Sequence, residues 1–164
     1  MLLRLIALSL TVIILLPSGA HLLELPGKIG LDRNAYFIVQ QIYAGWALFS
    51  IPIAAALVAN RALALTERRR DPGAARAAMC SVGLILMSLV VFFIWVFPAN
   101  QATANWTQIP DNWETLRRQW EYGHLASAII VFGALLATAR ATMHQAQARL
   151  NLPARPQPSA WFDF

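Results

Sequence analysis

The stretch AAMCSVGLILMSLVVFFIWVF, residues 77–97, decides the fold of this chain. It contains no Asp, Glu, Lys or Arg, and most of its side chains are large and apolar. A helix needs about 20 predominantly apolar residues to cross the roughly 30 Å hydrocarbon core of a membrane. The stretch therefore predicts a transmembrane helix.

Three further segments have the same character, and the four together predict an all-α integral membrane four-helix bundle. They cover residues 2–25, 36–60 and 116–139. The composition agrees, because 58% of the chain is hydrophobic and only 13% is charged, unlike a soluble domain. We expect one domain, residues 1–150, followed by a proline-rich cytoplasmic tail, residues 151–164.

Basic residues are scattered at the segment ends, which argues against a nucleic-acid-binding face. They are also distributed unequally between the two sides of the predicted bundle. One side carries Arg4, Arg61, Arg68, Arg69, Arg70, Arg76, Arg140, Arg149 and Arg155, and the other carries Lys28, Arg33, Arg117 and Arg118. By the positive-inside rule, this bias places both termini in the cytoplasm.

The first twenty residues also fit a secretory signal peptide. Arg4 precedes an apolar run that ends in the small residues Ser18-Gly19-Ala20. The apolar character continues to Leu25, past this potential cleavage site, so we expect an uncleaved helix.

Proline, glycine and capping residues predict where the helices bend and end. Pro26-Gly27 predicts the end of the first helix, and Asp32 or Asn34 the cap of the second. Pro17 and Pro52 predict kinks inside those two helices. The capping-box pattern of Asp111 and Glu114 starts the last helix near Asn112.

The loop before the last helix is rich in tryptophan. Trp106, Trp113 and Trp120 are seven residues apart, which predicts a short surface helix and an interfacial aromatic belt, with Arg117 as a head-group anchor. The single cysteine, Cys80, excludes an intrachain disulfide and is expected to be an inert buried thiol.

The candidate functional residues form a reversed pair, His21-x-x-Glu24 in the first segment and Glu121-x-x-His124 in the last. Residues three apart share one helix face, so in antiparallel helices His21 should face His124 and Glu24 should face Glu121. Ionisable groups inside a bilayer are costly and suggest a function. Other segments bring polar residues to the same level, namely Gln40, Gln41, Tyr43, Asn100 and Gln101.

These residues support several alternatives. His21, Glu24, Glu121 and His124 could ligate a transition metal such as Fe, Mn, Cu or Zn. The two histidines could instead be axial ligands of a haem. Without any cofactor, a histidine could act as a general base on a lipophilic phenol or hydroquinone, with Gln41, Tyr43 and Asn100 binding the substrate oxygen. The non-catalytic alternative is an interhelical clamp in an accessory subunit that assembles with itself or another membrane protein.

A family resemblance adds to this interpretation. The motifs Phe97-Pro98-Ala99-Asn100, Trp106, Pro110, Trp113-Glu114-Thr115-Leu116-Arg117 and Trp120-Glu121-Tyr122-Gly123-His124 resemble the DUF1772, or anthrone-oxygenase-like, group of small four-helix membrane proteins. The stretches His21 to Lys28 and Gln40 to Tyr43 look like a distinct bacterial branch. The resemblance implies a multi-pass protein of the bacterial inner membrane and an oxygenase for an aromatic, phenol-like substrate. Asn100, Trp120 and His124 match the recurrent positions, and some members are thought to act without an obvious cofactor.

Overall fold

The computed structural model describes residues 1–150, with side chains up to Met143. The tail predicted for residues 151–164 lies outside this range. Every regular element of the described part is helical, and the helices run in the order α1 (Leu2–Lys28), α2 (Arg33–Gln40), η1 (Gln41–Tyr43), η2 (Trp46–Phe49), α3 (Ser50–Glu67), α4 (Pro72–Val91), η3 (Phe92–Val96), α5 (Phe97–Ala102) and α6 (Trp113–Leu150).

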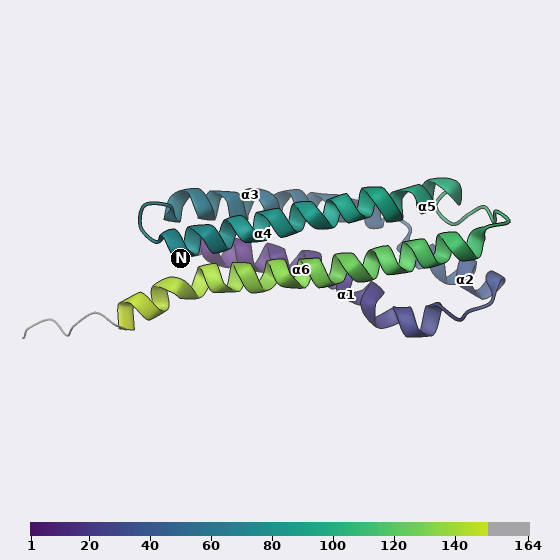
Figure 1. The fold of residues 1–164 in the computed structure, drawn as a ribbon, viewed down its shortest axis with the longest axis horizontal. Coiled ribbons are helices and arrows are strands. Elements are labelled where there is room, and N and C mark those ends of the chain that lie inside the picture. The colour runs from purple at the N-terminus through teal and green to yellow at the C-terminus, as the bar shows by residue number, and fades with distance from the viewer. Residues whose placement is uncertain (151–164) are drawn as a thin grey trace, which may run out of the picture.

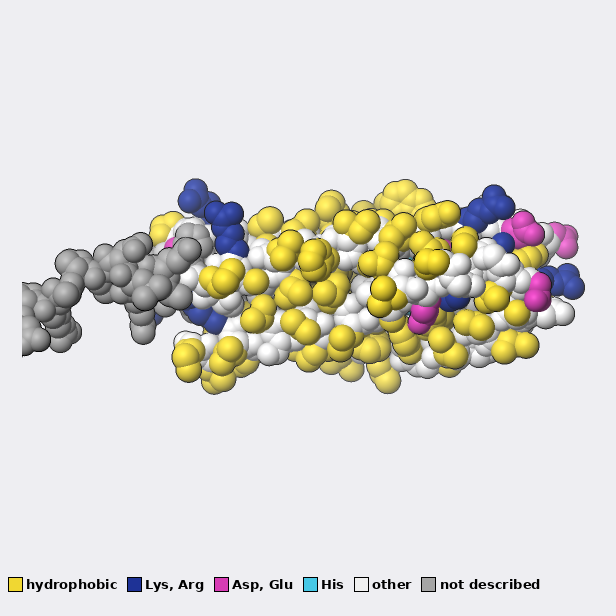
Figure 2. Space-filling model, turned by 90° about the horizontal axis from the view of Figure 1, so that it is seen from below, with side chains coloured by type: hydrophobic (Ala, Val, Ile, Leu, Met, Phe, Trp, Pro, Cys, Tyr) yellow, Lys and Arg dark blue, Asp and Glu magenta, His cyan; other side chains and the backbone are white. Residues whose placement is uncertain are grey.

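Four helical segments are long and apolar enough to cross a membrane, as expected of a multi-pass membrane protein: Leu2–Lys28, Trp46–Glu67, Pro72–Ala102 and Trp113–Met143. They lie side by side, with α2 and α5 at one end of the bundle and the N-terminus at the other (Figure 1). We call these ends the α2 end and the N-terminal end. Large apolar side chains cover the surface between them, whereas Lys and Arg gather toward the ends (Figure 2). Which end faces the cytoplasm stays a prediction.

The first helix does not end at Pro26-Gly27, as predicted, but continues to Lys28. Proline costs an α-helix about 3 kcal/mol through the lost hydrogen bond and the steric clash. The helix nevertheless resumes, because the N–H of Ile29 donates to the carbonyl of Leu25 at 3.0 Å. The contacts that Lys28 makes inside the bundle, described below, stabilise this last turn.

The second predicted segment is divided in two at Gly45. This glycine has a φ of +84°, in the left-handed region that favours glycine, and it separates η1 from η2. As a result, residues 33–43 form a separate short arm outside the four spans, capped by Asp32, whose Oδ1 accepts from the N–H of Ala35. Pro52 is the third residue of α3, where no helical N–H bond is needed, so the predicted mid-helix kink is wrong.

The third span contains a π-helix, η3, before it continues into α5. The side-chain amide of Gln119 donates to the carbonyl of Trp95 in this π-helix at 2.8 Å. Gly123 of α6 lies directly against it, because a Cβ at Gly123 would lie 2.9 Å from Cγ2 of Val96. A glycine is therefore required where α6 meets the π-helix.

The loop between α5 and α6 contains no surface helix, contrary to the prediction. Ala104, Asn105 and Trp106 all have positive φ values, 46°, 55° and 65°, and form a left-handed turn. The last helix begins at Trp113, next to the predicted Asn112. Cys80 is exposed rather than buried, and lies in the α4 surface.

Buried polar groups connect the helices below the α2 end. Thr11, Asn60, Ser81 and Thr138, one from each of the four spans, are all 0% exposed and hydrogen-bonded to one another. We call these four residues the polar layer. At the N-terminal end, the guanidinium of Arg4 lies 2.9 Å from the Glu67 carboxylate and also donates to the carbonyl of Thr142. Both sets of contacts fix the helices against sliding.

Candidate functional site at the α2 end

The two histidines of the reversed pair lie in contact. His21 of α1 and His124 of α6 have ring centroids 3.9 Å apart with an interplanar angle of 31°. The indole of Trp120 packs against both rings, with centroids at 4.9 Å from His21 and 4.2 Å from His124. Tyr43 and Trp46 cover another side of His21. The predicted approach of the two histidines is confirmed.

The two glutamates are joined by a lysine instead of facing each other directly. Nζ of Lys28 lies 3.1 Å from Oε1 of Glu121 and 3.8 Å from Oε2 of Glu24. It also donates to the hydroxyl of Tyr43 at 2.7 Å and to the amide oxygen of Gln40 at 3.2 Å. Lys28 is only 4% exposed, so its ammonium lies inside the bundle with its charge offset by carboxylates.

Aromatic rings complete the surroundings of the ammonium. Nζ lies 4.4 Å from the ring centroid of Tyr43 and 4.6 Å from that of Trp120. At these distances the ring faces attract a cation. The result is a closed cage of two carboxylates, an amide and two aromatic faces around one positive charge.

Two tyrosines of the short arm hold the carboxylates. The hydroxyl of Tyr36 donates to Oε1 of Glu121 at 2.9 Å and accepts from the amide of Gln40 at 2.8 Å. The hydroxyl of Tyr43 donates to Oε2 of Glu24. Burial, together with the neighbouring carboxylates, raises the pKa of both phenols above the usual value. The phenols therefore remain protonated donors.

Two polar atoms in this network have no hydrogen-bond partner among the described residues, namely Oε2 of Glu121 and Nδ1 of His21, which is an acceptor when the ring proton is on Nε2. Both are buried, and Nδ1 of His21 lies 4.0 Å from Glu24, beyond hydrogen-bond range. A buried polar atom without a partner costs about 1–3 kcal/mol. These atoms mark where an additional donor would bind most favourably.

The predicted metal ligands do not converge on one point in this structure. The histidine rings stack against each other, and both carboxylates contact Lys28 in the place where a cation would lie. The described residues contain no group of three or more His, Cys, Asp or Glu side chains that could hold a metal ion. A haem does not fit either, because axial histidines lie on opposite faces of a porphyrin, whereas these rings are in van der Waals contact.

The other predicted substrate residues lie at different distances from the histidines. Tyr43 and Trp120 contact His21 directly. The amide of Gln41 donates to the carbonyls of Phe37 and Trp106. Oδ1 of Asn100 accepts two indole N–H groups, from Trp106 at 3.0 Å and from Trp120 at 2.8 Å. Asn100 thus orients Trp120, whose indole packs against both histidines.

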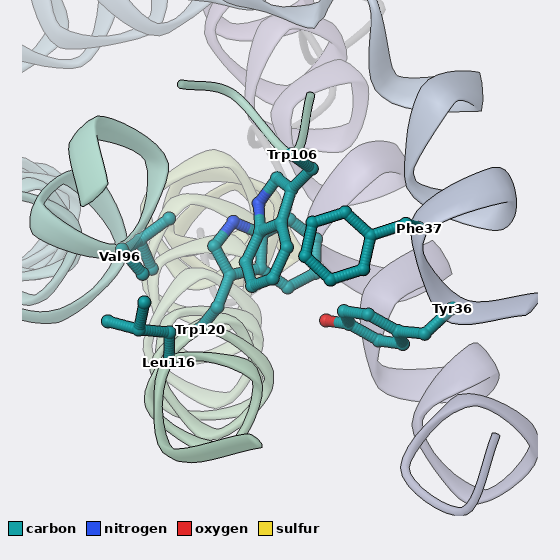
Figure 3. Close-up of a cluster of buried hydrophobic side chains, with 7 residues drawn as sticks. Tyr36, Phe37, Val96, Trp106, Leu116 and Trp120 are labelled. Carbon is teal, nitrogen blue, oxygen red and sulfur yellow. The ribbon is translucent and has the colours of Figure 1, made fainter. Parts of the chain in front are cut away.

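The prediction that the tryptophans form an interfacial belt is wrong for two of them. Trp106 and Trp120 are 4% and 3% exposed, and Figure 3 shows their indoles packed together beside Phe37 and Tyr36. Arg117 is likewise buried instead of anchoring α6 at the head groups. Its guanidinium donates to the carbonyl of Leu31 at 2.7 Å and lies over the ring of Trp113.

Lys28 and Tyr36 are the site residues that sequence reasoning missed, whereas Gln40 was among the polar residues expected at this level. A signal for Lys28 exists, because it follows His21 by seven residues and Glu24 by four, and so shares their helix face. That signal requires a helix that continues through Pro26. Tyr36 and Gln40 are four residues apart and lie on the buried face of α2.

No protein-family model, no curated protein and no solved structure matches the chain. Membership of the DUF1772 group therefore stays a prediction that rests on the motifs in the sequence.

Proposed function

We propose that this membrane protein binds a small lipophilic phenol or hydroquinone at the α2 end and removes the proton from its hydroxyl group. Deprotonation produces the anion, the form of such a molecule that is most easily oxidised. It would be the opening step of an oxidoreductase or a cofactor-free oxygenase, as the family resemblance implies. The observation that carries the proposal is the pair of unpartnered buried acceptors, Nδ1 of His21 and Oε2 of Glu121.

The chemistry of the ligand follows from these acceptors. An imidazole nitrogen and a carboxylate oxygen both accept a hydrogen bond from an O–H group, and imidazole is also a general base near neutral pH. The surrounding rings of Tyr43, Trp46 and Trp120 favour an aromatic molecule over an aliphatic alcohol. A molecule that combines an aromatic ring with a hydroxyl satisfies both features.

The ligand would enter from the side of the bundle. The side chain of Glu24 is 33% exposed, and Tyr43 and Trp46 are half-buried, whereas His21 behind them is buried. Glu24, Tyr43 and Trp46 lie along the edge between α1 and the segment from η1 to η2, which contains the left-handed Gly45. A molecule dissolved in the bilayer would reach the histidines by displacing Tyr43 or Trp46.

Ligand binding can be measured through the quenching of tryptophan fluorescence by a halogenated phenol, because Trp46 and Trp120 line the site. We expect His21→Ala and Glu121→Gln to weaken binding about ten-fold or more, since each removes an acceptor worth roughly 1.5–3 kcal/mol. Thr138→Val, which alters the polar layer instead, is the control and should bind normally. Equal affinities in all four proteins would refute the proposal.

The metal-dependent form of the proposal is tested by metal analysis of the unmodified protein and of two histidine-to-alanine variants. Metal would have to replace Lys28 between Glu24 and Glu121, so a stoichiometric metal that is lost in both His21→Ala and His124→Ala would support it. A metal-free protein that still binds the phenol would favour the general-base form.

The structural clamp is the second candidate function. Lys28 already uses its three donors on Glu121, Tyr43 and Gln40, and interhelical contacts of this kind stabilise helix packing without any ligand. The chain would then be an accessory subunit. In that case the histidine and glutamate variants should lower the melting temperature and leave phenol affinity unchanged.

A further inference from the structure

A second candidate site lies at the opposite end of the bundle, in a groove between α4 and α6. The groove has a volume of about 490 Å³ and is open along one side. It is lined by Gly73, Arg76, Ala77, Cys80, Leu136, Ala137 and Arg140. None of these residues belongs to the phenol site proposed above.

The groove is amphipathic along its length. Arg76 lies about one turn from the start of its membrane span, Pro72–Ala102, and Arg140 of α6 lines the groove beside it. Cys80 and Leu136 lie one turn further toward the middle of the bundle, roughly 6 Å away at 1.5 Å per residue. The groove therefore has a basic mouth at the membrane surface and an apolar channel that leads into the hydrocarbon.

Two guanidinium groups concentrate positive charge at the mouth of the groove. Both arginines are exposed, and neither makes an ion pair with any of the residues whose side chains are described. A similar groove of about 640 Å³ near the α2 end contains Arg118, but Glu114 lies 3.8 Å from that guanidinium. Two unpaired guanidinium groups favour an anion, and guanidinium matches the geometry of a phosphate oxygen pair.

We propose that the α4–α6 groove binds an anionic phospholipid, with Arg76 and Arg140 contacting the head-group phosphate and an acyl chain lying over Ala77, Cys80 and Leu136. The charge at the mouth selects an anion, and the apolar channel selects an anion that carries a hydrocarbon chain. A free phosphate would use only the mouth. The small side chains of Gly73, Ala77 and Ala137 leave the width that an acyl chain requires.

The position of Cys80 allows a direct test. It is the only cysteine of the chain and it is exposed in the groove, so a small fluorophore attached to it reports on this site alone. The labelled protein is placed in vesicles that contain phosphatidylglycerol or phosphatidylcholine with brominated acyl chains, which quench the fluorophore on contact. We expect brominated phosphatidylglycerol to be preferred about 25-fold, since two arginines each favour anionic lipid by about five-fold.

The arginine variants separate a specific site from general surface charge. Each of the two groove arginines is expected to contribute about five-fold to the preference for anionic lipid. R76Q/R140Q should therefore abolish the preference, while R76K/R140K should keep most of it. R68Q/R69Q removes the same charge from the exposed turn between α3 and α4 and should behave like the unmodified protein.

Three results would overturn the proposal. Equal quenching by the two brominated lipids would show that the groove does not select an anionic head group. An unchanged preference in R76Q/R140Q would place the selectivity elsewhere. Loss of the preference on addition of inorganic phosphate would show that the arginines take the free anion instead of the lipid.

Discussion

The ammonium of Lys28 lies 3.1 Å from a carboxylate oxygen of Glu121, a side chain that is only 1% exposed. The two residues belong to α1 and α6, the first and last spans of the described bundle. Their pairing offsets two charges that would each be costly in a membrane interior. The α2 end is therefore held together by one cation shared among groups from α1, α2, η1 and α6.

Lys28→Met should destabilise the protein strongly. Removing one partner of a buried ion pair leaves the other charge uncompensated and costs about 3–5 kcal/mol. The free energy of unfolding in detergent, measured by denaturant titration, should fall by this amount.

The double variant Lys28→Met/Glu121→Gln is the matched control, because it removes both charges. It should be more stable than Lys28→Met alone. If the second substitution gives no recovery, the charge pair is not the source of the loss.

Asn100 should be essential for the packing of the two buried indoles. Asn100→Leu deprives Trp106 and Trp120 of their shared acceptor, and each unpaired buried donor costs about 1–3 kcal/mol. We expect a lower melting temperature and a shift of tryptophan fluorescence. Asn100→Asp, which keeps an oxygen acceptor, should retain most of the stability, and equal losses in the two variants would contradict the assigned role.

A glycine at position 104 should stabilise the left-handed turn at residues 104–106. A residue with a Cβ pays about 1–2 kcal/mol for the left-handed conformation, whereas glycine adopts it freely. We expect Ala104→Gly to raise the free energy of unfolding by up to about 1 kcal/mol after the entropy cost of glycine is included. Ala102→Gly, two residues earlier within α5, should instead lower it, and the same sign for both variants would rule out this explanation.

Stability should fall in alkaline solution because of the buried phenols. Burial raises the pKa of Tyr36 and Tyr43, so the folded protein keeps their protons at a pH where the unfolded chain, with a tyrosine pKa of about 10, releases them. The contribution is complete below about pH 10 and is lost as the pH rises further. The slope of unfolding free energy against pH above 10 should be smaller in Tyr36→Phe, and parallel slopes would exclude Tyr36 as a source.

The four spans could be predicted from the sequence because length and hydropathy alone determine them. The helix limits could not be, since they depend on tertiary contacts. Pro26 normally ends a helix, but the buried contacts of Lys28 continue it for two more residues. Gly45 was unremarkable inside an apolar segment, yet its left-handed backbone separates the arm from the third helix.

The candidate site, too, could be predicted from the sequence only in part. The approach of His21 to His124 followed from spacing and antiparallel helices, which are properties of the sequence. The role of Lys28 did not, because a lysine after proline and glycine is typical of a solvent-exposed loop. The belt pattern of Trp106 and Trp120 was misleading for a related reason, since burial depends on how the loop folds back over α6 and on the acceptor that Asn100 provides.

The polar layer has a consequence for how the protein assembles during insertion. Thr138 donates to Asn60, is hydrogen-bonded to Ser81, and belongs to α6, the last of the four described spans. Until that span enters the bundle, the side-chain oxygen of Asn60 and the hydroxyl of Ser81 lack this partner in a medium that offers no water. A bundle of three helices would therefore leave buried polar groups unpaired, and α6 completes the polar layer when it packs against the other spans.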